Sequence, residues 1–416
     1  MEVLKIATAG SVDDGKSTLI GRILYDTQSL TLDKLEAIER TSKQKGYDYL
    51  DFSLATDGLV AEREQGITID VAHIYFSTPS KSYIIADTPG HVEYTRNMVT
   101  GASTSQASII LIDARKGVTE QTYRHFFINN LLRVKDVVVA INKMDLVDYS
   151  EEVFNEIKRN FEALNAKSNY TEQNISFIPV SALHGDNVVN GSTQMLWYTG
   201  GSVLDHFESL TQEKIYNTGT PRFPVQMVIR PKTEEFHDFR AFAGKVYGGD
   251  LHRGDEVIAL PSQQKSRIKD IYFYNEKYDT AARRSSVSIT LEDEINVSRG
   301  DMLVKANEIP TISKEVEAIV CWMDNKSLAL RNKYTLQHGV NKVLAVVTEV
   351  QHKINTDFSG IDENVEQVNM NDITKIKLKL NKAIYSDPFE EHRTNGSFIL
   401  IDNTTNHTVG VGFIQA

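Results

Sequence analysis

The sequence of 416 residues predicts an α/β domain followed by two small β-barrel domains. Short β-branched segments alternate with helical patterns in the first part of the chain, as in folds built on a parallel sheet. Beyond the Gly- and Pro-containing stretch Tyr216–Pro221, short strands follow one another with few helical patterns between them. A second break lies at Ala306–Pro310. We therefore expect domains at residues 1–215, 216–308 and 309–416.

The first domain is expected to contain a largely parallel sheet with helices on both faces. Its strands are predicted at Val3–Ala9, Asp70–Phe76, Tyr83–Asp87, Ala107–Asp113, Asp136–Asn142 and Ser176–Pro179. Apolar residues at three- and four-residue steps predict helices at Thr119–Leu132 and Ser150–Leu164. Helices are also expected at Ser17–Tyr25 and Thr31–Lys45. The short link Ser77–Ser82 between the second and third strands suits a hairpin, so one edge strand should run antiparallel.

The rest of the chain is expected to form two barrels, because short strands at this spacing usually close on themselves and so remove exposed edges. The strands of the first barrel are predicted at Phe223–Arg230, Phe239–Tyr247, Glu256–Ala259, Ser266–Phe273, Ser286–Leu291 and Asp301–Val304. Those of the second barrel are predicted within Glu315–Met323, Asn341–Lys353, Asp372–Tyr385 and Ser397–Ile414.

Composition excludes several classes of protein. The 45 Lys and Arg residues against 56 Asp and Glu residues give a net charge of −11, which disfavours nucleic-acid binding by bulk charge. The apolar runs are much shorter than the roughly 18–20 residues that span a bilayer, so no membrane segment is expected. Cys321 is the only cysteine, which excludes an internal disulfide framework and any multi-cysteine zinc site. Met1–Val3 lead into a strand without a basic segment, so no signal peptide and a cytoplasmic location are expected.

Residues Gly10–Ser17 fit the phosphate-loop pattern G-x-x-x-x-G-K-[ST], between a predicted strand and a predicted helix. Glycines let backbone N–H groups converge on phosphate oxygens, and the helix N-terminus adds a favourable field. Lys16 offers its charge to the β- and γ-phosphates, and the Ser17 hydroxyl is a ligand for Mg²⁺. The alternative is a chance match, which the strand–loop–helix context disfavours. The residues expected to contact a nucleotide here are Gly10, Ser11, Val12, Asp13, Asp14, Gly15, Lys16, Ser17 and Thr18.

A second motif, Asn142-Lys-Met-Asp145, follows an apolar predicted strand. A carboxylate at this edge accepts from N1–H and the 2-amino group of guanine, a pair of donors that adenine lacks. Ser181–Leu183 also follow a strand, and their backbone N–H groups can reach the guanine O6. Taken alone, the tetrapeptide is more often a loop with a salt bridge than a base pocket. The residues expected at the base are Asn142, Lys143, Met144, Asp145, Ser181, Ala182 and Leu183.

Two further segments are expected to sense the γ-phosphate. Asp87 ends a strand and can hold Mg²⁺ through a water, and the Gly90 N–H can bond the γ-phosphate until hydrolysis removes it. Thr68 can ligate Mg²⁺ by its hydroxyl and the γ-phosphate by its N–H, although alone it is equally a residue that opens a strand. The nucleotide contacts expected here are Asp87, Thr88, Pro89, Gly90 and His91, and the expected metal ligands are Ser17, Thr68 and Asp87.

His91 follows directly on that glycine. A loop histidine is usually solvated or a satisfied core group, but at this position it can orient the attacking water. The residues expected to carry hydrolysis are therefore His91, Gly90, Lys16 and Thr68. Asp14 stays open between a turn former in the phosphate loop and a contact that tunes nucleotide exchange.

Together these motifs resemble those of GTPases of the translation-factor superfamily, and the two predicted barrels complete the three-domain layout of elongation factors Tu and 1A. Gly10–Arg22, Leu50–Ala72 and Ile401–Gly412 are similar to the large, GTPase subunit of the bacterial two-subunit sulfate adenylyltransferase. Asp14 stands in the first stretch where elongation factors typically have His or Ser. Ser286–Asp301 adds to the similarity, which covers essentially the whole chain.

This resemblance implies a P-loop GTPase domain that binds GTP or GDP with Mg²⁺. It also implies that a separate small catalytic subunit binds ATP and sulfate and forms adenosine 5′-phosphosulfate and pyrophosphate, in a heterodimer or a higher assembly. GTP hydrolysis on the present chain would drive that uphill reaction. Two alternatives share the layout: a translation factor that carries aminoacyl-tRNA or a release factor, and a GTPase with an unrelated effector.

Overall fold

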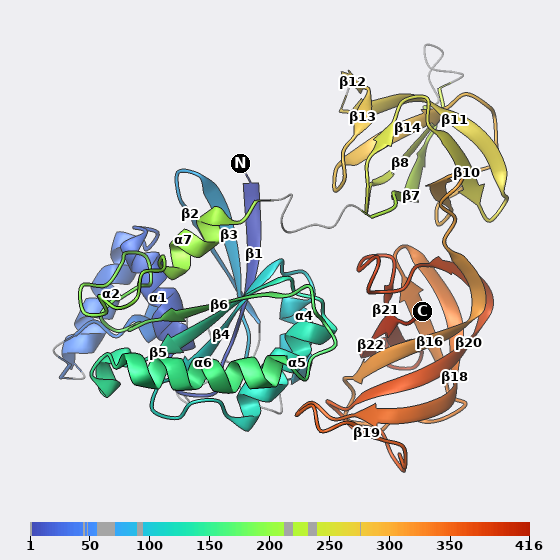
Figure 1. Cartoon of the computed structure of the whole chain (residues 1–416). Coiled ribbons are helices and arrows are strands. Elements are labelled where there is room, and N and C mark those ends of the chain that lie inside the picture. Colours follow the sequence, from blue (N-terminus) through green and yellow to red (C-terminus); the bar gives the residue numbers. More distant parts are fainter. Residues whose placement is uncertain are drawn as a thin grey trace. The chain divides into compact units, whose positions relative to one another are not determined.

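The computed structural model describes residues 2–44, 46–47, 49–55, 71–89, 95–211, 219–231, 239–274 and 276–416. The chain divides into two compact units, one of Met1–Ile215 with Asn355–Gly360 and one of Tyr216–Ile354 with Ile361–Ala416. Figure 1 shows the first as a sheet with helices around it and the second as two barrels. The domain limits 1–215, 216–308 and 309–416 stay predictions.

The first unit is built on one sheet with the strand order β2-β3-β1-β4-β5-β6 in its described part. The strands are β1 (Glu2–Ala9), β2 (Ala72–Ser77), β3 (Lys81–Asp87), β4 (Ala107–Asp113), β5 (Asp136–Asn142) and β6 (Asn174–Pro179). β2 pairs antiparallel with β3 at the edge, and the other neighbours pair parallel. The predicted parallel sheet with one antiparallel edge strand is confirmed.

The central strands β4 and β5 are buried at every position. Burial on both faces is why their sequences are continuous apolar runs rather than alternating ones. The register places Thr8 beside Asp87 and Asp113 beside Asn142, so polar residues at the strand ends line one edge of the sheet. β1 lies between β3 and β4, and the carboxyl end of such a strand is where open α/β sheets bind ligands.

Six α-helices occur in the described part of this unit: α1 (Lys16–Asp26), α2 (Leu32–Gln44), α4 (Thr95–Ala102), α5 (Glu120–Leu131), α6 (Glu151–Asn165) and α7 (Val203–Ser209). In α6, Ser150 caps the N-terminus by accepting from the Val153 N–H, and Phe154, Ile157 and Phe161 form the buried face. Helix α4 was not predicted, because it is only eight residues long and its buried apolar residues Met98, Val99 and Ala102 cover little more than one turn. Helix α7 was also missed, although Ser202 and Asp205 form a capping box at its start.

The second unit contains two closed barrels in its described part. In the first, the strand order β10-β15-β7-β8-β14-β11 is closed by the pairing of β10 with β11. The strands of this region are β7 (Arg222–Ile229), β8 (Ala241–Lys245), β9 (Leu251–His252), β10 (Glu256–Leu260), β11 (Gln264–Phe273), β12 (Glu276–Tyr278), β13 (Thr280–Ala281), β14 (Ser286–Leu291) and β15 (Met302–Lys305). Closure pairs the backbone groups that an open edge would expose.

The second barrel has the order β17-β21-β22-β16-β20-β18, closed by the pairing of β17 with β18. Its strands are β16 (Thr311–Trp322), β17 (Lys333–His338), β18 (Asn341–Ile354), β19 (Ile361–Asp362), β20 (Ile373–Ser386), β21 (Ser397–Asp402) and β22 (Thr408–Ile414). The segment Ser397–Ile414 therefore holds two strands, and β17 was not predicted. The predicted fold class, an α/β domain followed by two β-barrels, is confirmed.

A buried seam joins the two barrels. Arg222 of β7 donates from Nε and Nη2 to the two carboxylate oxygens of Asp387, at 2.9 and 2.8 Å. Its Nη1 donates to the carbonyl oxygens of Pro221 and Glu308, at 3.1 and 2.7 Å. Asn395 Nδ2 also donates to Asp387 Oδ2, at 2.7 Å. Burial works to raise the pKa of Asp387, but the hydrogen bonds from Arg222 and Asn395 outweigh it and lower the pKa.

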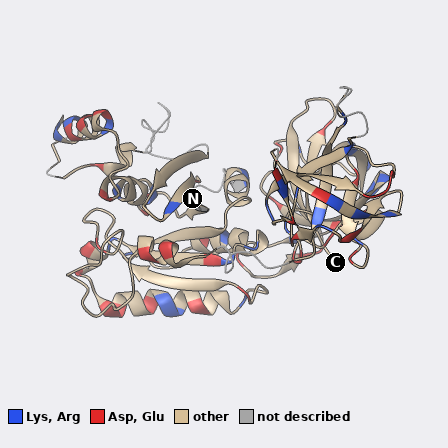
Figure 2. Ribbon diagram, turned by 90° about the horizontal axis from the view of Figure 1, so that it is seen from above, with Lys and Arg blue, Asp and Glu red and all other residues tan. Residues whose placement is uncertain are grey.

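Figure 2 shows acidic and basic residues mixed along the helices of the first unit and along the barrel strands. No helix among the described residues is both long and apolar enough to cross a membrane.

Candidate nucleotide-binding site

The phosphate loop connects β1 to α1 at the carboxyl edge of the sheet. Gly15 has a φ of +95°, a left-handed conformation that glycine adopts without cost, and it caps the N-terminus of α1. A Cβ atom on Gly15 would lie 2.4 Å from Asn142 Nδ2, so the close approach of the loop to β5 also requires glycine. The loop is thus shaped and packed as its sequence pattern requires.

Lys16 is buried at the start of α1, and its Nζ donates to the Gly10 carbonyl oxygen at 2.8 Å. Burial lowers the pKa of Lys16, and the charges of Asp87, Asp14 and Asp13 oppose that shift. Ser17 and Thr18 follow in the first turn of α1, half-buried, where the helix N-terminus favours an anion. Ser11 and Val12 are half-buried in the loop.

The end of β3 lies directly beside the loop. The Thr8 hydroxyl donates to Asp87 Oδ1 at 3.1 Å, and the Thr88 hydroxyl donates to the Thr8 carbonyl oxygen at 2.5 Å. Both Asp87 and Thr88 are buried, and Pro89 follows them. Three residues predicted to act on the γ-phosphate, Thr68, Gly90 and His91, lie outside the described residues, so their roles stay predictions.

Asn142 connects three loops through its side-chain amide. Nδ2 donates to the Asp14 carbonyl oxygen at 2.8 Å, and Oδ1 accepts from the Ala182 N–H at 3.0 Å. Lys143 adopts φ +64° and donates from Nζ to the Asp13 carbonyl oxygen. The second motif thus holds the phosphate loop on one side and Ser181–Leu183 on the other.

The residues predicted to contact the base lie where these loops meet. Asp145 Oδ1 accepts from the Ser181 hydroxyl at 2.6 Å, which fixes the carboxylate predicted to read guanine. Met144, the residue before Asp145, is buried, and its N–H donates to the Val180 carbonyl oxygen at 3.2 Å. The Leu183 carbonyl oxygen accepts from Arg22 Nη1 of α1 at 3.3 Å.

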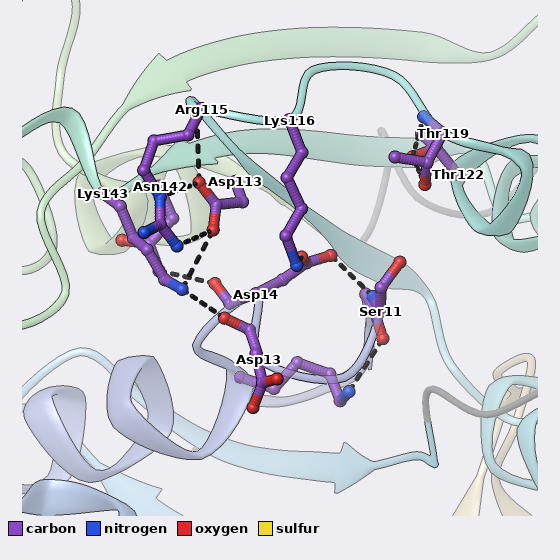
Figure 3. A network of polar contacts seen from close by, with 12 residues as sticks. Ser11, Asp13, Asp14, Asp113, Arg115, Lys116, Thr119, Thr122, Asn142 and Lys143 are labelled. Atoms are coloured by element: carbon purple, nitrogen blue, oxygen red, sulfur yellow. Dashed lines mark hydrogen bonds and ion pairs between the residues drawn. The ribbon is translucent and has the colours of Figure 1, made fainter. Parts of the chain in front are cut away.

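Sequence reasoning missed the turn that follows β4. The buried Asp113 carboxylate binds Arg115 at 3.0 and 2.7 Å and Lys143 Nζ at 3.0 Å (Figure 3). Burial works to raise the pKa of Asp113, but the hydrogen bonds from Arg115 and Lys143 hold it well below its ordinary value. The next residue, Lys116, lies with Nζ 4.0 Å from Asp14 Oδ1. The available signal was a carboxylate at the end of a buried strand, in register with Asn142.

The donor set fits Mg²⁺ bound together with a nucleotide. A hydroxyl, Ser17 in the first turn of α1, and a carboxylate, Asp87 at the end of β3, lie at the same edge of the sheet, and oxygen ligands of this kind suit Mg²⁺. Among the described residues, no cluster of three or more His, Cys, Asp or Glu forms a metal site. Mg²⁺ often takes one or two protein ligands together with phosphate oxygens and waters, and Ser17 and Asp87 suit that arrangement.

Comparisons with known proteins agree with this geometry. The family model described as "Elongation factor Tu GTP binding domain" matches residues 1–217, and "GTP-eEF1A C-terminal domain-like" matches residues 315–415. The fold and the site define a GTPase of the elongation-factor type. Solved structures of sup35 with GDP and with GMPPNP align over 100% of this chain and 94% of theirs, at a TM-score of 0.45 and 21% identity.

Relatives of known name narrow the class further. "Sulfate adenylyltransferase subunit 1" of Bacteroides fragilis is 45% identical over 99% of this chain and 86% of its own length. The protein of that name from Pseudoalteromonas atlantica is 45% identical over 99% of this chain and 87% of its own. "Bifunctional enzyme CysN/CysC" of Mycobacterium tuberculosis is 45% identical over 99% and 67%. The chain belongs to the sulfate adenylyltransferase subunit 1 family, which confirms the resemblance seen in the sequence.

Proposed function

We propose that this chain is the GTP-hydrolysing regulatory subunit of a sulfate adenylyltransferase. It couples GTP hydrolysis to the formation of adenosine 5′-phosphosulfate and pyrophosphate from ATP and sulfate, which a separate catalytic subunit carries out in the cytoplasm. The observation that carries this proposal is the 45% identity to proteins named sulfate adenylyltransferase subunit 1 over 99% of the chain, in both structural units.

Each part of the site has a role in this proposal. The loop Gly10–Thr18 binds the phosphates, with Lys16 as the point charge. Asp145 reads the guanine by accepting from its N1–H and 2-amino group. Asn142 holds the loops together, and backbone N–H groups of Ser181–Leu183 reach the guanine O6. Ser17, Asp87 and Thr68 hold Mg²⁺, which neutralises charge on the phosphates when it is bound. Thr88 and Pro89 lead from β3 to Gly90, whose N–H senses the γ-phosphate. His91 follows directly and orients the attacking water.

Coupling requires that the partner distinguish the GTP and GDP states. A ligand shifts an equilibrium only by its difference in affinity for the two states. The segments of Thr68 and of Gly90–His91 are the ones whose contacts depend on the γ-phosphate, so these segments should contact the small catalytic subunit differently in the two states. By linkage, the partner must also change the affinity of the site for GTP relative to GDP.

The test mixes the full chain with a small catalytic subunit, ATP, sulfate and Mg²⁺, and follows adenosine 5′-phosphosulfate with and without GTP. We expect a higher yield with GTP and no gain with GDP. An Asp145→Asn variant serves as the control, since it should respond to xanthosine triphosphate rather than to GTP. Equal yields with and without GTP would remove the proposal.

The elongation-factor match favours a second candidate, a factor that carries aminoacyl-tRNA. A pull-down at physiological salt separates the two functions. GTP-loaded chain should retain the small adenylyltransferase subunit. Retention of aminoacyl-tRNA instead would favour the translation factor.

A further inference from the structure

Asp14 is a buried carboxylate inside a loop that is shaped to hold an anion. It is 4% exposed, and its Oδ2 accepts from the Ser11 N–H at 2.6 Å. Its own N–H donates back to the Ser11 carbonyl oxygen at 3.2 Å, which closes a turn in the phosphate loop. Burial raises the pKa of Asp14, and the Ser11 N–H and the charges of Lys116 and Lys16 oppose that shift. A negative charge here repels phosphate unless a cation offsets it.

Lys116 is the cation placed to offset that charge. Its Nζ lies 4.0 Å from Asp14 Oδ1, and its side chain is 46% exposed. The turn that carries it is fixed, because the N–H groups of Lys116 and Gly117 both donate to the Asp113 carbonyl oxygen, at 2.9 and 3.0 Å. Gly117 has φ +68°, which closes this turn. Lys116 is thus presented to the phosphate loop by a rigid support.

Neighbouring cations are engaged elsewhere. Arg115 and Lys143 converge on the Asp113 carboxylate, and Lys16 donates to the Gly10 carbonyl oxygen. Figure 3 shows Lys116 extended toward Asp14 from the turn, with Arg115 and Lys143 around Asp113. Of these four cations, Lys116 is therefore the one directed at the Asp14 carboxylate.

We propose that Asp14 and Lys116 form a clasp that sets how fast the nucleotide leaves the phosphate loop. Lys116 acts through Asp14: it offsets a charge that otherwise repels the phosphates and holds the loop against the turn after β4. Both are positioning residues. The proposal rests on the proposed function, because it requires that GDP and GTP bind at this loop.

The experiment is a double-mutant cycle on the full chain. Release of a fluorescent methylanthraniloyl-GDP is followed by stopped flow for the unmodified chain, Asp14→Asn, Lys116→Ala and the double variant. Asp14→Asn keeps an acceptor for the Ser11 N–H but removes the charge, so release should slow several-fold. Lys116→Ala should speed release roughly two- to fivefold in the unmodified chain and less than about 1.5-fold in the Asp14→Asn background.

Matched variants separate the clasp from general charge and stability effects. Lys158 also lies 4.0 Å from a carboxylate, Glu162, with a side chain 42% exposed, so Lys158→Ala should leave release unchanged. Lys116→Arg keeps the positive charge, so it should release the nucleotide about as slowly as the unmodified chain does. Asp14→Ser, which also removes the charge and keeps a side-chain oxygen, replaces Asp14→Asn if that variant does not fold.

The outcomes discriminate clearly. Equal acceleration by Lys116→Ala in both backgrounds would mean that Lys116 acts on the phosphates directly, which overturns the clasp. Faster release by both Asp14→Asn and Asp14→Ser would overturn it as well. Failure of the unmodified chain to bind the GDP probe would remove the proposed function and the clasp together, whereas binding with additive substitutions would remove the clasp alone.

Discussion

Lys16 in the first unit and Arg222 in the second are both buried cations, but they are satisfied differently. Arg222 makes four hydrogen bonds to Asp387 and two carbonyl oxygens, all within the protein. Lys16 makes one described hydrogen bond, to the Gly10 carbonyl oxygen, although an ammonium group has three donors. A buried cation that uses four of its five N–H donors within the protein holds structure, whereas one that uses one of three beside glycine-containing backbone is suited to bind an anion.

The strongest test of this contrast is Arg222→Ala. Removing one partner of a buried ion pair leaves the other uncompensated, so the free energy of unfolding of the barrel unit should fall by about 3–5 kcal/mol. Trp322 is buried in the second barrel, so in a Trp197→Phe background its fluorescence reports this unit during denaturant unfolding.

Arg253→Ala is the matched control for Arg222. Arg253 lies 3.8 Å from Asp270 with a side chain 58% exposed, and its loss should cost well under 1 kcal/mol, as for surface pairs. Equal losses of unfolding free energy for Arg222→Ala and Arg253→Ala would show that the buried pair contributes no more to stability than an exposed one. GDP affinity should survive in both.

The next largest effect is expected for Asp145→Asn in the base site. GTP affinity should fall roughly 100-fold, or about 2.7 kcal/mol, while affinity for xanthosine triphosphate rises, because the amide donates to the 2-oxo group. The Ser181 hydroxyl can still donate to the amide oxygen, so the loop should keep its shape. Calorimetry with both nucleotides measures the change.

Asp148→Asn, an exposed change in the same loop, is the control. Unchanged GTP preference would show that Asp145 does not read the base.

A smaller effect is expected for His91→Ala. GTP binding should stay nearly intact while hydrolysis slows at least tenfold, about 1.4 kcal/mol of barrier, because the water loses its orienting group. Single-turnover assays separate the chemical step from product release. The exposed His184→Ala serves as control. Turnover equal to that of the unmodified chain would place the water-orienting role on another residue.

The smallest effect concerns pH and the seam. His392 and His338 lie at this seam, because His392 Nδ1 accepts from the Asn395 N–H at 3.0 Å and His338 Nε2 lies 2.7 Å from the Asn395 carbonyl oxygen. Burial lowers the pKa of His392, with Asp387 opposing, and burial also lowers the pKa of His338. Below about pH 6.5, both histidines therefore bind fewer protons in the folded chain than in the unfolded chain. Barrel stability should therefore fall as the pH drops through 6.5, by at most about 1.4 kcal/mol per pH unit for each histidine.

Denaturation of the same Trp197→Phe background at pH 7.5, 6.5 and 5.5 measures this dependence. His392→Gln should reduce the slope, and the exposed His407→Gln should leave it unchanged. A slope that His392→Gln does not alter would show that the seam histidine does not titrate on unfolding.

The sequence alone was sufficient to predict the features that depend on a few consecutive residues. The continuous apolar runs of β4 and β5 and the glycine-rich turn before Lys16 are visible in a few consecutive residues. The Arg222–Asp387 pair joins residues 165 apart, and no neighbouring residue signals either partner. Lys116 and Asp113 belong to no motif, and the register of β4 with β5 is what brings Asp113 beside Asn142. The short helix α4 packs on β1, β3 and α5, and its few buried apolar residues are too short a run to be recognised from the sequence.

The amide of Asn142 has a consequence for sequence variation in this family. Its Nδ2 must donate, because it faces the Asp14 carbonyl oxygen, and its Oδ1 must accept, because it faces the Ala182 N–H. Aspartate would set two oxygens against each other, leucine would leave both partners without a bond, and glutamine would overreach by one methylene. Saturation mutagenesis with selection for growth on sulfate should therefore return asparagine alone at this codon.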